Sequence, residues 1–309
     1  MPRHVPGRYR HPPTRPRPCA PLSGTCCQCR GSSWRACGKY PTPRRPYPTD
    51  LSDTAWSRIR GLVVPTHHKG GRPCSQARWR EHVDALHYIT RTGCPWRALP
   101  HDFTAGWSAA HKHFTKWTRT GLWQRLLRVL REEARTRTGR KPKPTAAIVD
   151  SSSVKGMPVA GPRGFDGAKK IDGIKRHILV DTTGLLLGVH ATPANVQDRA
   201  AFADLLTARD AKTVTKVWAD KGHTGTAPAE AAAKAGIDLD IVCGPKPAGG
   251  FLVQPRRWVV ERTNGWNNHH RRLVRQYETT LAAHEGFLML SQIGLLLRRL
   301  DHGQLFDTL

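Results

Sequence analysis

Acidic residues are scarce in this sequence. Only 23 Asp and Glu stand against 50 Lys and Arg in 309 residues, which gives a formal net charge of +27. A charge of this size and sign indicates a polyanionic partner, because Lys and Arg neutralise phosphates and release their counterions. Nucleic acid is the expected partner. An anionic membrane surface is the alternative, but it requires an amphipathic or spanning segment.

Long hydrophobic runs are also missing. The longest apolar stretch, residues 287–297, has 11 residues and is interrupted by Ser291, Gln292 and Gly294. A spanning helix needs about 20 apolar residues. The basic residues at the N-terminus are not followed by an apolar stretch, so we expect no signal peptide. These absences predict a cytoplasmic protein without membrane contact.

The cysteines offer neither a disulfide framework nor a clear zinc motif. Five of the eight lie between Cys19 and Cys37, and without a secretion signal they are not expected to pair. Cys26 and Cys29 form a CxxC, with Cys37 and His11 nearby, which leaves a zinc knuckle open. The many prolines and arginines of residues 1–48 favour a disordered basic tail instead. A phosphate-binding glycine loop with its lysine is absent, so ATP-driven chemistry is not indicated.

Residues 49–135 show helical periodicity and predict a small all-helical domain of the helix-turn-helix kind. We interpret its apolar stripes as core rather than as a platform for stacking bases. The residues that recur at helical spacing are Trp56, Ile59 and Val63, then Trp79, Val83 and Leu86, then Trp107, Ala110, Phe114 and Trp117, and finally Leu122, Leu126 and Val129.

A basic linker, residues 135–143, precedes a change of pattern to short apolar runs alternating with helices. Strands are predicted at 145–149, 174–180, 185–190, 214–219 and 239–242, and helices at 199–208, 227–234, 256–273 and 281–300. The sequence Asp181 to Gly184 suits a hairpin turn between the second and third strands. Residues 144–301 are therefore predicted to form an α/β domain with a mixed sheet, an order compatible with a ribonuclease-H-like fold.

Two of the predicted strands lead directly into an aspartate, Asp150 and Asp220. Ligands gather at the carboxyl ends of strands in open α/β sheets. Either acid alone could be a helix cap or a turn residue, but two in equivalent positions favour a functional site.

A third acid, Glu261, lies on a predicted helix, where Arg257, Glu261, Asn264 and Asn268 share one polar stripe. Glu261 either forms an ordinary ion pair with Arg257 on a solvated face, or the stripe faces the carboxyl end of the sheet. In the second case three carboxylates converge, which is enough to hold two Mg²⁺ ions.

Several motifs resemble one known family, the insertion-sequence DDE transposases of the IS-five type in the IS-four-like superfamily. The resemblance covers most of the chain, from about Leu51 to Leu300, with its motifs in the right order. The matching stretches are 93–100 in the helical segment, 164–170 continuing through 175–177 to 180–181, 218–222 around the second aspartate, and 258–263 with Trp266 and 271–273.

The resemblance implies a DDE catalytic domain of ribonuclease-H-like fold, with Asp150, Asp220 and Glu261 as the catalytic and metal-binding acids. It implies two Mg²⁺ or Mn²⁺ ions, double-stranded DNA as the partner (terminal inverted repeats and target), and a homodimer on DNA. The residues implied to contact DNA are Arg257, Lys169, Lys170, Lys175, Arg176, Arg271 and Arg272.

The implied activity is cleavage at transposon ends and transfer of the 3′-hydroxyl into target DNA. Two alternatives stay open: a catalytically inactive DNA-binding protein derived from such an element, and a stand-alone nuclease of the same fold. The chain departs from the family signature at Gln254 and Asn268, where tyrosine and lysine are usual, and at His223-Thr224-Gly225, where a Tyr-Ala-Gly-like triplet is usual.

Overall fold

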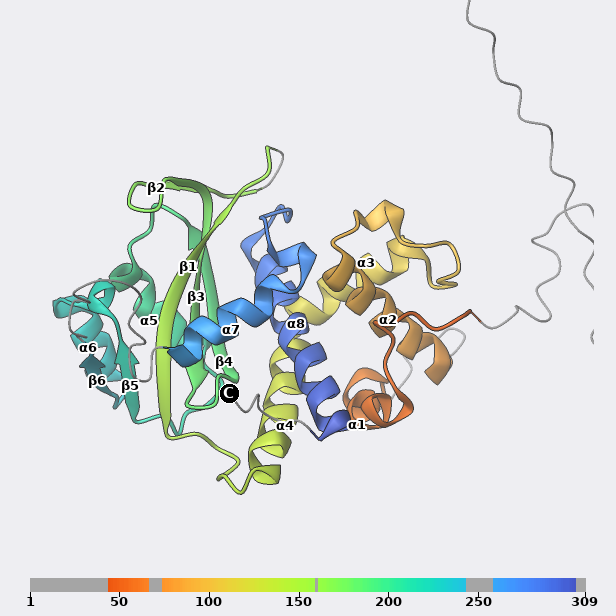
Figure 1. Cartoon of the computed structure of the whole chain (residues 1–309), viewed down its shortest axis with the longest axis horizontal. Helices are drawn as coiled ribbons and strands as arrows, with labels where there is room; N and C mark the ends of the chain where they lie inside the picture. Colours follow the sequence, from red (N-terminus) through yellow and green to blue (C-terminus); the bar gives the residue numbers. More distant parts are fainter. Residues whose placement is uncertain (1–43, 67–73, 159–160, 243–257, 304–309) are drawn as a thin grey trace, which may run out of the picture. The chain divides into compact units, whose positions relative to one another are not determined.

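The computed structural model describes residues 44–66, 74–158, 161–242 and 258–303 (Figure 1). Residues 45–309 belong to one compact unit. Residues 1–43 of the predicted tail (1–48), with the cysteines from Cys19 to Cys37, lie outside the described residues, and so does Arg257. The zinc knuckle therefore stays an open prediction. The prediction of disorder is wrong for Tyr47, whose hydroxyl donates to the Asp102 carboxylate at 3.0 Å.

Four helices follow one another in the N-terminal part, as the periodicity predicts. They are α1 (Asp53–Val63), α2 (Gln76–Thr92), α3 (Gly106–Arg119) and α4 (Leu122–Arg137), with a short 3-10 turn η1 (Trp96–Ala98) after α2. The Ser52 side chain caps α1 by accepting a hydrogen bond from the backbone N–H of Ala55. Gly93 ends α2 in the left-handed conformation, with φ of 74°.

Three details of this helical part differ from the prediction. Trp107, assigned to an apolar stripe of the core, is 39% exposed on α3; the other two differences concern α4. Val129 is 41% exposed, while Leu127 and Leu130 are buried in its place, because α4 turns its apolar face further round than the spacing suggested. The helix also continues through Arg135, so residues 135–137 are not linker. Arg135 is buried and forms an ion pair with the buried Asp181.

In the described residues the second part contains a six-stranded sheet, which is mixed, as predicted. Its strands are β1 (Ala146–Lys155), β2 (Gly164–Asp166), β3 (Ile171–Asp181), β4 (Leu186–Pro193), β5 (Lys216–Ala219) and β6 (Asp238–Ile241). β3 pairs antiparallel with β1, β2 and β4, whereas β5 and β6 run parallel to β1. Only the short β2 was not predicted, because three residues are too few to show a period.

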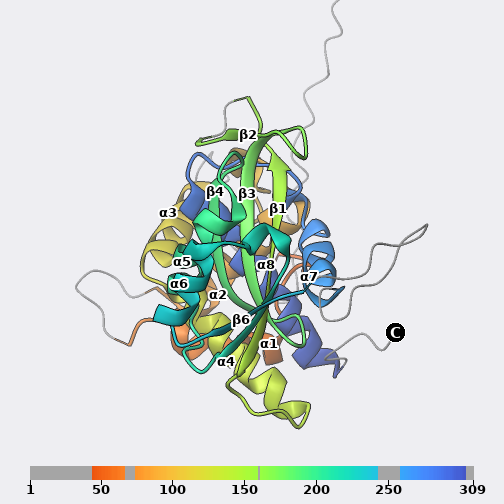
Figure 2. The same cartoon turned by 90° about the vertical axis from the view of Figure 1, so that its left-hand side faces the viewer.

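Alternating side chains give the sheet two buried faces. Ala147 and Val149 of β1 pack in a core with α5 (Asp198–Ala208) and α6 (Thr226–Lys234), which lie in front of the sheet in Figure 2. Ile148 points to the opposite core, which contains α7 (Trp258–Asn268) and α8 (Leu281–His302). That second core also includes residues of α1 to α4, so the segments predicted as separate domains, 49–135 and 144–301, share hydrophobic packing.

Candidate active site

Asp150 lies within β1 and Asp220 follows the neighbouring strand β5, at the same level of the sheet. The parallel pairing of β1 with β5 ends where Ile148 meets Trp218, and each aspartate follows two residues further along its own chain. Asp220 comes directly after β5, as predicted. The prediction that β1 ends at Asp150 is wrong, because the antiparallel partner β3 continues and pairs with β1 as far as Lys155.

This difference leaves the two carboxylates together. β5 has only four residues, so β1 loses its parallel neighbour just before Asp150 while the pairing of Asp150 with Ile178 of β3 persists. Asp150 therefore lies at the carboxyl end of the parallel pair although it lies within its own strand. Ligands collect at this kind of position in α/β sheets.

The side chain of Asp220 is held by its own turn, the 3-10 helix η2 (Lys221–His223). One carboxylate oxygen, Oδ1, accepts hydrogen bonds from the backbone N–H of Gly222 at 3.0 Å and from Nδ1 of His223 at 2.9 Å. His223 is only 1% exposed, and its ring lies edge-on to Phe202 with centroids 5.5 Å apart. The sequence marked His223 as a departure from the family motif but gave no sign of this contact.

Helix α7 approaches the aspartates from the other face of the sheet. The Asn264 side chain donates a hydrogen bond from Nδ2 to Oδ2 of Asp150 at 3.2 Å. Glu261 lies one helical turn earlier on the same side, and its side chain is exposed, as is that of Asn268. The structure thus brings Asn264 of the polar stripe to the sheet, while Val259 and Thr263 pack into the core.

The helix is shorter than the sequence suggested. It ends at Asn268, and a 3-10 turn η3 (Arg271–Leu273) follows, rather than one helix to residue 273. Across the described ranges, no group of three or more His, Cys, Asp or Glu side chains is arranged to hold a metal ion. The two aspartates and Glu261 therefore do not form a closed set of metal ligands in this conformation.

The cations expected to contact DNA divide into exposed and buried ones. Lys169 and Lys170 are exposed in the turn between β2 and β3, where Lys170 adopts a positive φ of 54°. Arg271 is exposed at the start of η3. These three side chains are accessible to a phosphate backbone.

Lys175, Arg176 and Arg272 are buried instead, so they cannot reach a phosphate on the surface in this conformation. The Lys175 ammonium donates to the carbonyl of Val196 at 2.8 Å and lies 3.2 Å from Oδ1 of Asp198. Burial lowers the pKa of Arg176 to about 10. Lys175 and Arg176 point to opposite faces of β3, and both are buried because β3 is covered on both faces, which a linear motif does not reveal.

Lys175 belongs to a buried polar cluster that the sequence did not predict. Asp166 accepts a hydrogen bond from the Ser153 hydroxyl at 2.6 Å and lies 3.9 Å from Lys175; the Ser153 bond is the main reason why the pKa of Asp166 is lowered. Burial lowers the pKa of His177 to about 4, against the opposing effect of Asp198. The cluster joins β1, β2 and β3 to the start of α5.

Two family models match the chain in succession. Residues 51–127 match a family described as "Putative transposase of IS4/5 family", and residues 141–243 match "Transposase DDE domain". A helix with the length and apolar character needed to cross a membrane is not found in the part of the chain that the structure describes.

Two curated relatives are also similar. A putative transposase for insertion sequence element IS402 from Burkholderia cepacia is 32% identical over 152 residues, which is 46% of this chain and 70% of the relative. An uncharacterized protein, y4sN, from Sinorhizobium fredii is 36% identical over 84 residues, 27% of this chain and 65% of the relative.

Proposed function

Because this chain belongs to the IS4/5 family of insertion-sequence DDE transposases, we propose that it cuts DNA at the ends of its element and joins the freed 3′-hydroxyl to target DNA. One observation carries the proposal: Asp150 and Asp220 lie side by side at the end of the β1–β5 pair, with Asn264 of α7 hydrogen-bonded to the first. Two-metal phosphoryl transfer on DNA uses convergent carboxylates of this kind to hold the ions.

The fold we propose for the catalytic part is ribonuclease-H-like. The strands follow the order β4, β3, β1, β5, β6, with three antiparallel strands and then two parallel to β1. Helices lie on both faces, and the first aspartate is on the central strand. The match of residues 141–243 to a transposase DDE domain supports this assignment.

Asp150, Asp220 and Glu261 are the proposed catalytic acids and the proposed ligands of Mg²⁺ or Mn²⁺. Their chemistry fits, because Mg²⁺ is commonly held by one or two protein carboxylates together with substrate phosphates and water, and two aspartates on adjacent strands supply that number. When bound, two such ions would activate the attacking hydroxyl and stabilise the leaving oxygen.

The protein's own part in this chemistry is to orient the acids. Gly222 and His223 hold one oxygen of Asp220, and Asn264 holds one oxygen of Asp150. Hydrogen bonds to a ligating carboxylate fix its direction and tune its affinity. Glu261 is exposed on the same side of α7 as Asn264, so it can approach bound DNA and metal without leaving a core position.

The proposed substrate is double-stranded DNA, as terminal inverted repeats and as target. Exposed Lys169, Lys170 and Arg271 are the proposed phosphate contacts, together with Arg257, which lies outside the described residues. The helical segment 49–135 is proposed as the part that recognises the ends, and a homodimer as the form that brings two ends together.

A reconstituted reaction tests this function. The purified full chain is incubated with labelled duplexes that carry the element's ends and with a target plasmid, in Mg²⁺, in Mn²⁺ or in EDTA. We expect cleavage at the ends and joined products in either metal and neither product in EDTA. DNA binding without cleavage would point to an inactive DNA-binding derivative, and hydrolysis that ignores end sequence and never joins strands would point to a nuclease.

A further inference from the structure

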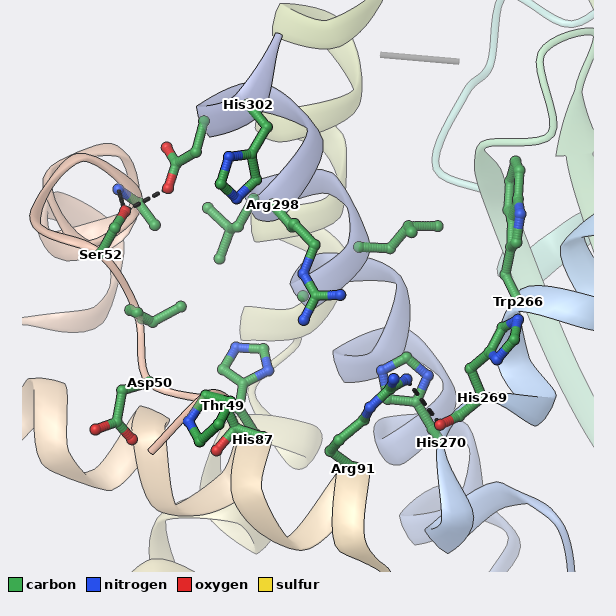
Figure 3. Close-up of a pocket in the computed structure, with 17 residues that line it drawn as sticks. Thr49, Asp50, Ser52, His87, Arg91, Trp266, His269, His270, Arg298 and His302 are labelled. Atoms are coloured by element: carbon green, nitrogen blue, oxygen red, sulfur yellow. Dashed lines mark hydrogen bonds between the residues drawn. The ribbon is translucent and has the colours of Figure 1, made fainter. Parts of the chain in front are cut away.

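A cavity of about 380 Å³ opens between the segment before α1, helix α2, the end of α7 and helix α8 (Figure 3). Its wall includes His87 and Arg91 from α2, Trp266 from α7, His269 just after α7, and Arg298 from α8. The cavity is thus built on α7, the helix whose Asn264 contacts Asp150, but none of the three proposed catalytic acids lines it.

The two arginines of this cavity are not neutralised by nearby carboxylates. Arg91 donates from Nη1 to the backbone carbonyl of His269 at 2.8 Å, and within the described ranges neither Arg91 nor Arg298 forms an ion pair. The acids in the wall are engaged elsewhere. Asp301 accepts hydrogen bonds from the hydroxyls of Ser52 and Thr54.

The other acid, Asp50, accepts a hydrogen bond at 2.9 Å from the backbone N–H of Tyr47. It approaches from the side opposite His269 and His270 in Figure 3, with Thr49 beside it. The cavity therefore has an acidic, hydrogen-bonded side and a side where two guanidinium groups remain available for a negatively charged ligand.

Two histidines of the cavity wall, His87 and His270, carry buried ring nitrogens. His87 is only 7% exposed, and among the described residues its Nε2 has no hydrogen-bond partner; the same holds for Nδ1 of His270. Figure 3 shows the His87 ring pointing toward the guanidinium of Arg298. A buried nitrogen without a partner is unfavourable, so a rotation of the His87 ring that brings Nε2 to a ligand oxygen would satisfy a group that the protein leaves unsatisfied.

The pKa values of His87 and His270 are lowered by burial and partly by the positive charges nearby. Burial lowers the pKa of His87 to about 3 and that of His270 to about 4, and the charge of Arg298 contributes to both shifts. Arg91 adds to the shift of His270. Both rings are neutral at pH 7 and can donate one N–H each, while the arginines supply the charge.

We propose that this cavity binds a phosphate group of the DNA backbone, with Arg91 and Arg298 neutralising it and His87 donating a hydrogen bond. The inference rests on the proposed function, because it takes DNA to be the ligand. Guanidinium groups suit this task, since they bind phosphate oxygens in pairs. Because α7 also carries Glu261 and Asn264, a phosphate held here sets the position of the DNA relative to the proposed catalytic acids.

The test measures how duplex DNA binding depends on salt. Arg91→Gln, Arg298→Gln and the double variant of the full chain are compared with Arg125→Gln, an exposed arginine of α4 that does not line the cavity. Each lost phosphate contact lowers the slope of log affinity against log salt by about 0.9. We expect Arg91→Gln, Arg298→Gln and the double variant each to lose about 0.9 of the slope, because both arginines contact the same phosphate, and Arg125→Gln to keep the wild-type slope. Unchanged slopes in all cavity variants would overturn the proposal.

A second measurement uses the unaltered protein and so does not depend on the variants folding. The arginine reagent phenylglyoxal is applied with and without duplex DNA, and modified peptides are quantified by mass spectrometry. We expect DNA to protect Arg91 and Arg298 but not Arg125. A further sample contains inorganic phosphate in place of DNA. Protection of Arg91 and Arg298 by inorganic phosphate but not by DNA would overturn the proposal. Neither measurement needs a metal ion. Phosphate binding in the cavity can therefore be refuted while end cleavage is observed, and it can be confirmed while end cleavage is absent.

Discussion

Arg271 and Arg272 are adjacent in the sequence and were both expected to contact DNA, yet their surroundings are opposite. Arg271 is exposed. Arg272 is 6% exposed, donates from Nε to Glu278 at 2.6 Å and from Nη1 to the carbonyl of Cys94 at 3.1 Å, and lies over the ring of Phe287. We predict that Arg272→Gln destabilises the protein without directly removing a DNA contact, and that Arg271→Gln does the reverse.

The magnitude follows from the burial of the pair. Glu278 is 6% exposed, so Arg272→Gln leaves a buried carboxylate without its cation, a change that costs about 3–5 kcal/mol. For a protein of this size each kcal/mol moves Tm by about 2–4 °C, so Tm should fall by roughly 6–20 °C. The double variant Arg272→Gln, Glu278→Gln removes the unpaired charge and should recover part of this loss.

Thermal unfolding and DNA affinity, measured on the same preparations, separate the two roles. Arg271→Gln should keep the wild-type Tm and lower the salt slope of DNA binding by about 0.9. Arg272→Gln, assayed below its Tm, should keep the slope. The reasoning is refuted if Arg272→Gln melts like the wild type, or if Glu278→Gln makes the single variant worse instead of better.

Two further predictions concern histidines. His223→Ala removes the hydrogen-bond donor to Asp220. It should lower the rate of end cleavage by about 10–100-fold and raise the Mg²⁺ concentration needed for half the maximal rate. His223→Gln should recover part of the rate and part of the Mg²⁺ affinity, and an unchanged Mg²⁺ requirement in His223→Ala would contradict the orienting role. Burial depresses the pKa of His87, His177 and His284 below 6.5 in the folded state. The unfolded chain therefore binds more protons between about pH 6.5 and 4, and the free energy of unfolding falls with acidification by up to about 1.4 kcal/mol per pH unit for each proton. Urea unfolding from pH 7.5 to 5 should show this decline beginning near pH 6.5, and a flat profile would contradict it.

The sequence predicted the helices and strands well where apolar spacing was strong. The stripes of Trp56, Trp79 and Phe114 lie on real helices, and the hairpin at Asp181 forms as its turn residues suggest. It failed where partners from distant segments decide the outcome. β1 runs past Asp150 because β3 pairs with it, which no local pattern encodes.

The candidate site shows the same division. Asp150 and Asp220 each follow a short apolar run that predicts a strand, so the sequence alone could place both acids at the sheet. The contacts of Asn264 and His223 with these acids depend on how α7 and η2 pack. Burial of Lys175 and Arg176 was likewise invisible, because a basic motif does not reveal that β3 is covered on both faces.

End cleavage by acid-to-amide variants is the most direct test of the central claim, that Asp150, Asp220 and Glu261 carry the chemistry. Asp150→Asn, Asp220→Asn and Glu261→Gln are assayed in Mg²⁺ beside Glu230→Gln, an exposed acid of α6. The account predicts that each of the three loses activity by more than the ~100-fold typical of residues that only orient a metal ligand, with DNA affinity and Tm retained, while Glu230→Gln cleaves like the wild type. Wild-type cleavage by any of the three variants would contradict the assignment of that acid.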